Sequence, residues 1–361
     1  MADRFENGIF GMIRPEDWLQ IGYDVERPND PTSELWGDVK TDNLVAYWES
    51  IAAEYNVPVM AQFHAFDTEA QKALRVPVDT HNIEKGLIKE KIDQSERLRA
   101  LINRGVTNQS ALYEKVLRDG YNLADHVFTR AIVAKNEVLY TGKMTIKENN
   151  LNVTVDYGVP NANLNKTLDF GAGATAPLDE QLLALVGDSQ DKGVPIDTLY
   201  TTSTDFNRFR KDTNIQKAIN GVYMQGQLVR NADLRQYLGE EFGITRIILQ
   251  DGVYSKPYTM GQNGRPVTTS NHLYPVGKFT FAHTGGGKIG DGLWGDPPEV
   301  SAARFMDVSA SEVSPYVYVS QYAENDPAVT WTKASALFMP VLYNPNGLYI
   351  AAYTNTTGNT H

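Results

Sequence analysis

Apolar and small residues recur at alternating steps of four and three between Thr107 and Thr141. This spacing places them on one face of a helix, as packing against a core requires. Thr107 or Asn108 can cap the start of that helix, and Gly142 can adopt the left-handed conformation that ends one. The pattern therefore predicts one long helix. Its recurring positions are Leu112, Val116, Gly120, Leu123, Val127, Ala131, Ala134 and Val138, and Phe128 widens the face that we expect to be buried.

The period of the pattern changes directly after this helix. Apolar residues at 151, 153, 155 and 157 alternate with polar ones, which predicts a half-buried strand. The turn-forming residues 147–150 precede it. We therefore expect strands over Met144–Tyr157, and we expect them to share one antiparallel sheet with the strand-rich tail, Tyr316–Tyr353.

The N-terminal part reads as irregular as far as Lys40, because residues 27–32 carry two prolines and several turn formers. Apolar residues of 44–55 share one helical face, so we expect a short helix that begins near Thr41 and stops at Pro58. Residues 59–85 look extended and polar, and such a long excursion from a compact domain is usually functional. A second short helix is expected over Ile88–Ile102.

The centre of the chain alternates strands and helices. We expect helices over 205–220 and 232–242, with strands over 197–200, 245–249 and 278–282. Asn263-Gly264 is a strong hairpin signal. These elements together predict an α+β protein.

Composition narrows the possible functions. The chain has 361 residues, a net charge of −11 and no cysteine. The absence of cysteine excludes disulfides and thiolate chemistry, and the acidity argues against a duplex-binding protein, which needs a basic footprint. We expect no membrane span and no signal peptide, because the sequence has neither a long apolar run nor a basic, apolar start.

No residue set has the spacing that catalysis or metal binding requires. Gly285-Gly286-Gly287-Lys288 suggests a phosphate-binding loop, but Ile289 stands where the motif needs a hydroxyl. The six histidines show no metal-ligand spacing, and no serine-hydrolase motif occurs. We therefore predict no catalytic residue, no metal site and no cofactor.

Three segments carry a resemblance to a known family. The first runs from Phe66 through Arg75-Val76-Pro77 to Ile88, and the second is the long helix with the strands that follow it. The third is the end of the chain, where Asp326-Pro327, Pro340 and Asn344-Pro345 occur in order. Together they resemble the major head protein family of phage lambda (capsid protein E), whose members have the Hong Kong 97-type capsid fold.

The resemblance implies an α+β fold with a spine helix, a peripheral antiparallel sheet, an axial domain and an extended E-loop. The implied division is an N-terminal arm with a short helix over 1–58 and an E-loop over 59–90. The spine helix and the first part of the peripheral domain follow over 91–177, then an axial domain over 178–300 and the C-terminal peripheral strands over 301–361.

The implied function is that of a major capsid protein, which assembles with itself into the hexamers and pentamers of an icosahedral shell around viral DNA. The resemblance also implies a separate scaffolding protein and a portal as partners, and it allows a decoration protein as a further one. The expected locations are the virion capsid and, during assembly, the host cytoplasm. Charged residues of the E-loop are then candidate contacts between subunits: Glu69, Lys72, Arg75, Asp79 and Lys85.

Two other functions fit the composition. One is the shell protein of a cellular nanocompartment with the same fold, although no match to a cargo-docking terminus is present. The other is an acidic hydrolase with unrecognised carboxylates. Without the resemblance, the sequence alone indicates only an acidic α+β protein.

Overall fold

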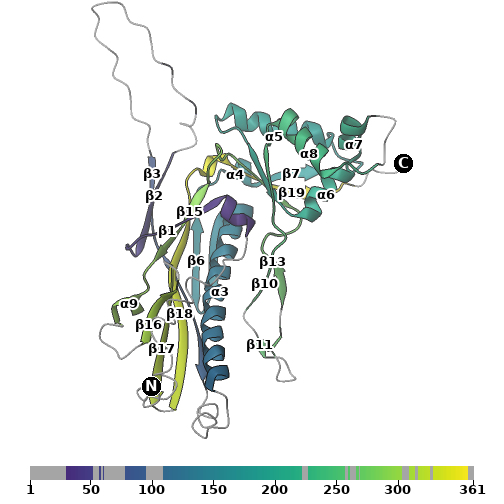
Figure 1. The fold of residues 1–361 in the computed structure, drawn as a ribbon. Coiled ribbons are helices and arrows are strands. Elements are labelled where there is room, and N and C mark those ends of the chain that lie inside the picture. The colour runs from purple at the N-terminus through teal and green to yellow at the C-terminus, as the bar shows by residue number, and fades with distance from the viewer. Residues whose placement is uncertain are drawn as a thin grey trace, which may run out of the picture.

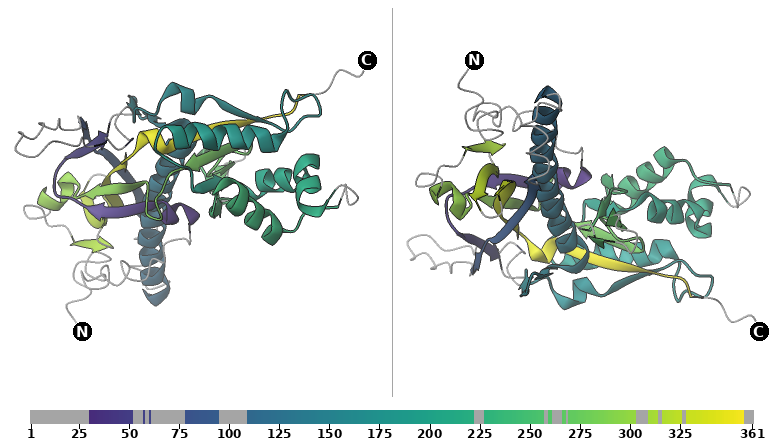
Figure 2. Two further views of the ribbon diagram at one scale, coloured as in Figure 1. Left: turned by 90° about the horizontal axis from the view of Figure 1, so that it is seen from above. Right: turned by 90° about the horizontal axis from the view of Figure 1, so that it is seen from below.

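The fold is described from a computed structural model, which places residues 30–51, 57, 60, 78–94, 109–221, 227–256, 259–260, 266–267, 269–302, 309–313, 316–325 and 328–356. Two sheets lie beside one long helix, α3 (Gln109–Thr141). Seen from above and below, the larger sheet and the helices α5–α8 lie on opposite sides of α3 (Figure 2). The helix predicted over 107–141 is therefore present.

The larger sheet is built around β18 (Ala328–Leu342), which has neighbours along both edges. On one edge β18 pairs with β17 (Val317–Asn325) and then with β15 (Gly290–Gly295). On the other edge it pairs with β4 (Gly86–Gln94). The strands β16 (Ser309–Val313) and β1 (Trp36–Lys40) extend the sheet beyond β17 and β15, and β1 runs parallel to β15.

The smaller sheet has the order β7-β19-β14-β8-β9 and carries helices on one face (Figure 1). Its strands are β7 (Lys166–Asp169), β19 (Leu348–Thr354), β14 (Lys278–Ala282), β8 (Thr198–Thr201) and β9 (Arg246–Leu249). The helices of this region are α5 (Leu178–Asp191), α6 (Ser203–Lys211), α7 (Thr213–Asn220) and α8 (Asn231–Phe242).

Paired ribbons and short helical segments complete the fold. The ribbons are β2 (Val45–Ile51) with β3 (Val78–Glu84), β5 (Lys143–Glu148) with β6 (Leu151–Asp156), β10 (Val253–Ser255) with β13 (Ser270–His272), and β11 (Thr259–Met260) with β12 (Pro266–Val267). The short helices are η3 (Pro31–Glu34), α4 (Asn161–Leu164), α9 (Pro298–Ala302) and η6 (Pro345–Gly347).

Two of the predicted helices are wrong. The segment after Thr41 forms strand β2, and the segment after Ile88 begins in strand β4. Ile88 and Ile92 are four residues apart, and a spacing of four keeps residues on one face of either a helix or a strand. Pairing with β18 decides the conformation of β4, and the sequence of β4 alone does not contain that information. The remainder of the second predicted helix, 95–102, lies outside the described residues.

Other expectations are corrected in detail. The helix predicted over 205–220 is divided at Asp212, whose side chain caps α7 by accepting from the amides of Asn214 and Ile215. The chain before Lys40 is not all irregular, because Leu35 and Trp36 are fully buried. The prediction that Met144–Tyr157 and Tyr316–Tyr353 share a single sheet is also wrong. The strands β5 and β6 form their own ribbon, and β19 joins the smaller sheet.

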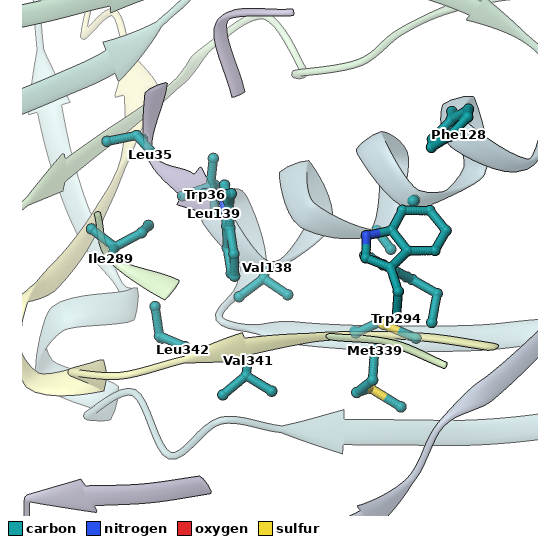
Figure 3. Close-up of a cluster of buried hydrophobic side chains, with 14 of the residues drawn as sticks. Leu35, Trp36, Phe128, Val138, Leu139, Ile289, Trp294, Met339, Val341 and Leu342 are labelled. Atoms are coloured by element: carbon teal, nitrogen blue, oxygen red, sulfur yellow. The ribbon is translucent and has the colours of Figure 1, made fainter. Parts of the chain in front are cut away.

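Apolar side chains form two buried clusters, one on each face of the smaller sheet. Tyr200 and Ile350 belong to the cluster around α3, whereas Leu199 and Tyr349 belong to the cluster under α5–α8. Val127 and Phe128 of α3 are buried as predicted, while the side chains of Leu112 and Val116 lie outside the description. Figure 3 shows Val138 and Trp294 between α3 and β18, with Met339 and Val341 on the other side of the strand.

The contact between α3 and the smaller sheet also has a buried polar part beside its apolar one. Asn136 of α3 donates to Thr32 Oγ1 (2.9 Å) and accepts from the Tyr200 hydroxyl (2.8 Å). Gln250 also donates to Thr32 Oγ1 (3.1 Å) and bonds to Asp30. We call these five residues the polar seam. Because buried polar groups are costly unless they are bonded, the seam fixes one position of the sheet against the helix.

A buried ion pair fastens β1 to α3. Lys135 Nζ lies 2.8 Å from Asp38 Oδ1, with side-chain exposures of 6% and 18%. The indole of Trp294 donates to the same oxygen at 2.6 Å. We expect Lys135→Met to lower the free energy of unfolding by about 3 kcal/mol, because it leaves the Asp38 charge buried without its cation. Urea unfolding of the soluble subunit measures this change.

The matched control is Lys143→Met. The ion pair of Lys143 with Asp156 has the same kind of geometry (2.7 Å) but is 44% and 54% exposed, so its loss costs at most about 1 kcal/mol. Equal effects of the two substitutions would contradict the role given to Lys135.

The carboxylate of Asp197 holds the turn after β14. It accepts hydrogen bonds from the backbone amides of Thr284 (3.0 Å) and Gly285 (2.7 Å) and from the hydroxyls of Thr284 and Thr198. Burial alone would raise the pKa of Asp197, but these hydrogen bonds outweigh it and the pKa is lowered.

This lowered pKa predicts acid sensitivity. The stabilisation by ionised Asp197 is fully present above the ordinary aspartate pKa and is lost as the pH falls through the lower, folded-state value. We therefore expect Asp197→Asn to reduce the free energy of unfolding by about 1–3 kcal/mol near neutral pH. The gap between wild type and variant should close below about pH 4. A pH series of unfolding curves measures it, and a gap that widens in acid would contradict the assignment.

Candidate assembly interface

The residues predicted to contact other subunits fall into three groups. Glu69, Lys72 and Arg75 lie outside the described residues. Asp79 lies in β3 opposite Ser50, and its side chain is not described. Lys85 lies between β3 and β4, and it alone of the five has a described side chain.

Lys85 is an internal residue. It is 3% exposed, and its ammonium group donates to the Thr41 carbonyl (2.8 Å), the Thr41 hydroxyl and the Trp294 carbonyl (3.0 Å). Burial lowers its pKa, while the nearby Asp42 and Asp296 carboxylates act in the opposite direction. With its donors bonded inside its own chain, Lys85 is corrected from a contact between subunits to an anchor for the base of the β2–β3 ribbon.

The inner face of the β2–β3 ribbon packs on the rest of the subunit. Trp48 is 5% exposed, stacks on the His81 ring (4.9 Å between centroids) and contacts Tyr157 (5.9 Å). Ala46 is also buried. Because successive strand residues point to opposite faces, Val45, Tyr47 and Glu49 point away from the core.

This outer face is open to solvent and mixes apolar with acidic groups. Val45 is 44% exposed and Tyr47 is 54% exposed. The Tyr47 hydroxyl donates to Glu49 at 2.6 Å, and this hydrogen bond raises the pKa of Tyr47. Glu84, directly opposite Val45, is exposed on the same face. We call Val45, Tyr47, Glu49 and Glu84 the acidic ribbon face.

The tip of the β5–β6 ribbon also exposes apolar residues. Met144 and Val155 pair directly and are buried, but Val153 and Leu151 further along the same face are 45% and 56% exposed. Asn149 and Asn150 form the turn with positive φ angles of 49° and 65°. An apolar face that continues past the subunit's own core is typical of a surface covered by a partner.

A basic and aromatic surface lies on the face of the larger sheet that points away from α3. Ile88 and Ile92 pack towards the first apolar cluster and Glu90 bonds to His126 of α3, so Lys89 and Lys91 point the other way. Lys91 Nζ lies 3.7 Å from the centroid of the Trp331 ring and 3.4 Å from the Tyr322 hydroxyl. We call Lys89, Lys91, Tyr322 and Trp331 the basic sheet face.

Sequence reasoning missed this surface because it assigned a helix to residues 88–102. Read as a strand, the same residues alternate Ile88, Glu90 and Ile92 with Lys89, Lys91 and Asp93. That alternation is the signal that would have placed the two lysines together on an exposed face.

The described residues hold no cluster of side chains that could bind a metal ion. His126 instead bonds to Glu90 at 2.8 Å, which raises its pKa, and His283 donates to the Pro195 carbonyl. The triple-glycine turn already binds an anion of its own chain, since the amide of Gly285 donates to Asp197. The turn is thus a structural contact for an internal carboxylate.

Two of the cavities in the described part of the chain are open to the surface. One, of about 560 Å³, lies between α5 and α8, with Ile196 and Phe242 among its apolar lining and Glu240 and Glu241 among its acidic lining. The other, of about 480 Å³, lies between α3 and the base of the β10–β13 ribbon. Among the helices described, none is long and apolar enough to cross a membrane.

Comparison with known proteins agrees with this architecture. The fold resembles a crystal structure described as a prophage capsid protein from E. coli CFT073, with a TM-score of 0.56 and 10% identity over 95% of this chain and 99% of that one. It also resembles a phage-related protein from Bordetella bronchiseptica RB50, with a TM-score of 0.51 and 9% identity over 94% and 97%. No curated protein sequence matches the chain.

The family model for phage major capsid protein E matches residues 88–353, which is most of the chain. The match includes α3, the basic sheet face and nearly all of both sheets, but not β1 of the larger sheet. The chain therefore belongs to the phage major capsid protein E family, and it is a shell-forming major capsid protein of a tailed phage with the Hong Kong 97-type fold.

Proposed function

We propose that this chain forms the hexamers and pentamers of an icosahedral head that encloses viral DNA. The observation that carries the proposal is the family match over 88–353. The exposed apolar residues Tyr47, Val153 and Leu151 on two ribbons support it, because assembly would bury them. The division into arm, E-loop, peripheral and axial domains is part of the proposal.

The proposed role is structural and not enzymatic. The net charge of −11 suits an inner surface that does not grip packaged DNA, and the subunit should show no sequence-specific DNA binding. A separate scaffolding protein and a portal are proposed partners, a decoration protein is a further one, and assembly is proposed to occur in the host cytoplasm. The family match does not favour a cellular nanocompartment or a hydrolase.

Electron microscopy of the expressed chain, with and without its neighbouring open reading frames, tests this function. We expect closed shells when a scaffolding partner is present, and DNA as their content in infected cells. Persistent monomers under every condition would contradict the proposal, and so would shells filled with an enzyme cargo.

The remaining E-loop candidates yield a second test. Replacing Gln71–Arg75 with a short Gly-Ser turn removes Lys72 and Arg75, which are proposed to meet carboxylates on an adjacent acidic subunit. We expect a folded, soluble subunit that fails to form shells, because an arm of this length gains its order from a neighbour. Circular dichroism measures folding, and sedimentation measures assembly.

Each contrary outcome of that experiment is informative. Normal assembly would show that residues 71–75 are not an arm between subunits. Loss of folding would show that they belong to the subunit's own core.

A further inference from the structure

The groove between α5 and α8 has an apolar floor. The two helices lie beside each other on one face of the smaller sheet (Figure 1). Leu183, Val186 and Gly187 line the cavity of about 560 Å³ between them, and steps of three and four residues place all three on one face of α5. Leu183 is 54% exposed, although Leu182 and Leu185 of the same helix are buried. An exposed leucine at the edge of a concave apolar surface is typical of a binding groove.

Gly187 keeps this groove open. It lies inside α5, where glycine is less favourable than alanine because of its greater backbone freedom. Among the described residues, a Cβ atom at position 187 would meet no atom of a neighbouring element within 4 Å. The packing of the subunit itself therefore does not require glycine at this position. The missing side chain lets another molecule approach the backbone of α5 closely.

The rim of the groove is negative. Glu240 and Glu241 are exposed in the last turn of α8, where the partial negative charge of the helix end disfavours carboxylates. Neither glutamate forms an ion pair with a residue that the structure describes, and no lysine or arginine lines the cavity. Asp197 also lines it, but its carboxylate already binds the turn after β14. The two glutamates therefore present negative charge beside an apolar floor, without a cation of their own chain.

We propose that the groove between α5 and α8 holds a basic, amphipathic helix of the scaffolding protein. This inference rests on the proposed shell-forming function and names the place on the subunit where one proposed partner docks. Apolar side chains of the bound helix lie on Leu183, Val186 and Gly187, and its lysines or arginines face Glu240 and Glu241. This is the helix-in-groove mode of recognition, in which apolar residues at i, i+3, i+4 and i+7 enter a groove.

The charge and the size of the groove favour this occupant over others. A second copy of the chain carries a net charge of −11 and is repelled by a negative rim. A cavity of about 560 Å³ takes only a few side chains, and salt weakens the contacts of exposed charges. The contact is therefore weak and reversible. Such a contact suits a scaffold that leaves after assembly, and not a protein that stays on the finished shell.

Fluorescence anisotropy with a designed peptide tests the groove. The probe is a labelled helix of about 15 residues, with leucines at i, i+3, i+4 and i+7 and lysines at the other positions. The wild-type subunit should bind it, and Glu240→Lys with Glu241→Lys should weaken binding by about tenfold or more. A scrambled peptide of the same composition should bind wild type more weakly by a similar factor. The matched control, Asp93→Lys with Glu324→Lys, makes the same charge change at exposed positions of the larger sheet and should leave the affinity unchanged.

Filling the groove gives an independent test. Gly187→Leu should keep or raise the melting temperature, because leucine is the better helix former and position 187 has open space around it. The same substitution should weaken peptide binding by about tenfold or more, because the new side chain occupies the groove. Ala184→Leu is the matched control, since it adds the same bulk to an exposed position of α5 outside the cavity, and it should leave binding unchanged.

Photo-cross-linking identifies the natural occupant. A benzophenone amino acid takes the place of Leu183 in the full chain, which is expressed together with its neighbouring open reading frames. We expect links to a basic helix of the scaffolding protein during assembly and none in the finished shell. Links to a second copy of this chain, or to a protein that remains on the finished shell, would overturn the assignment.

The outcomes separate this inference from the proposed function. If wild type never forms shells, the proposed function fails. If wild type forms shells but does not bind the peptide, or if Gly187→Leu binds it equally well, the groove is not the docking site and the function stands. An equal loss of affinity in the Asp93→Lys, Glu324→Lys control also overturns the inference, because it shows only a general attraction between a basic peptide and an acidic protein.

Discussion

A single helix, α3, has to pack against two sheets at once, and the arrangement of the subunit follows from this constraint. Along its middle, Leu123, Val127 and Ala131 are buried in the apolar cluster that includes residues of β18. Near the end of α3, Asn136 forms hydrogen bonds with Thr32 and with Tyr200 of the smaller sheet. The first contact is non-directional, whereas the second admits only one set of partners. The apolar part therefore stabilises the assembly of elements, and the polar seam fixes the position of one sheet relative to the other.

Elements with a strong local period could be predicted from the sequence. The helix α3 follows a long run of three- and four-residue steps, and the alternation of β6 is equally regular. The strands β2 and β4 were mistaken for helices because their conformation depends on partners far along the chain. The pairing of β19 with β14 is of the same kind, since nothing within 348–354 identifies its sheet.

The candidate interface was less accessible to sequence reasoning than the fold. A lysine such as Lys85 looks like a surface charge in any sequence pattern, and only the positions of Thr41 and Trp294 show that it is buried. The ammonium group of Lys91 lies over the ring of Trp331, which is 240 positions later in the chain, so the sequence near Lys91 does not reveal this contact. Likewise, Asp197 gives the triple-glycine turn a role that its motif does not reveal. Function depends here on long-range neighbours, which composition and spacing do not encode.

The connection of the β2–β3 ribbon to the larger sheet determines how the subunit bears mechanical load. A force pulling on the ribbon passes along the backbone from β2 into β1 and from β3 into β4, which pair with β15 and β18. The Lys85 ammonium group ties the base of the ribbon to the Trp294 carbonyl of β15 as well. The strand β15 is hydrogen-bonded along β18, so tension enters the larger sheet along its strands, as shear of many hydrogen bonds in parallel. The polar seam and the smaller sheet lie off this path. A load applied to the ribbon would therefore stretch the larger sheet, while the smaller sheet and its helices carried little of the strain.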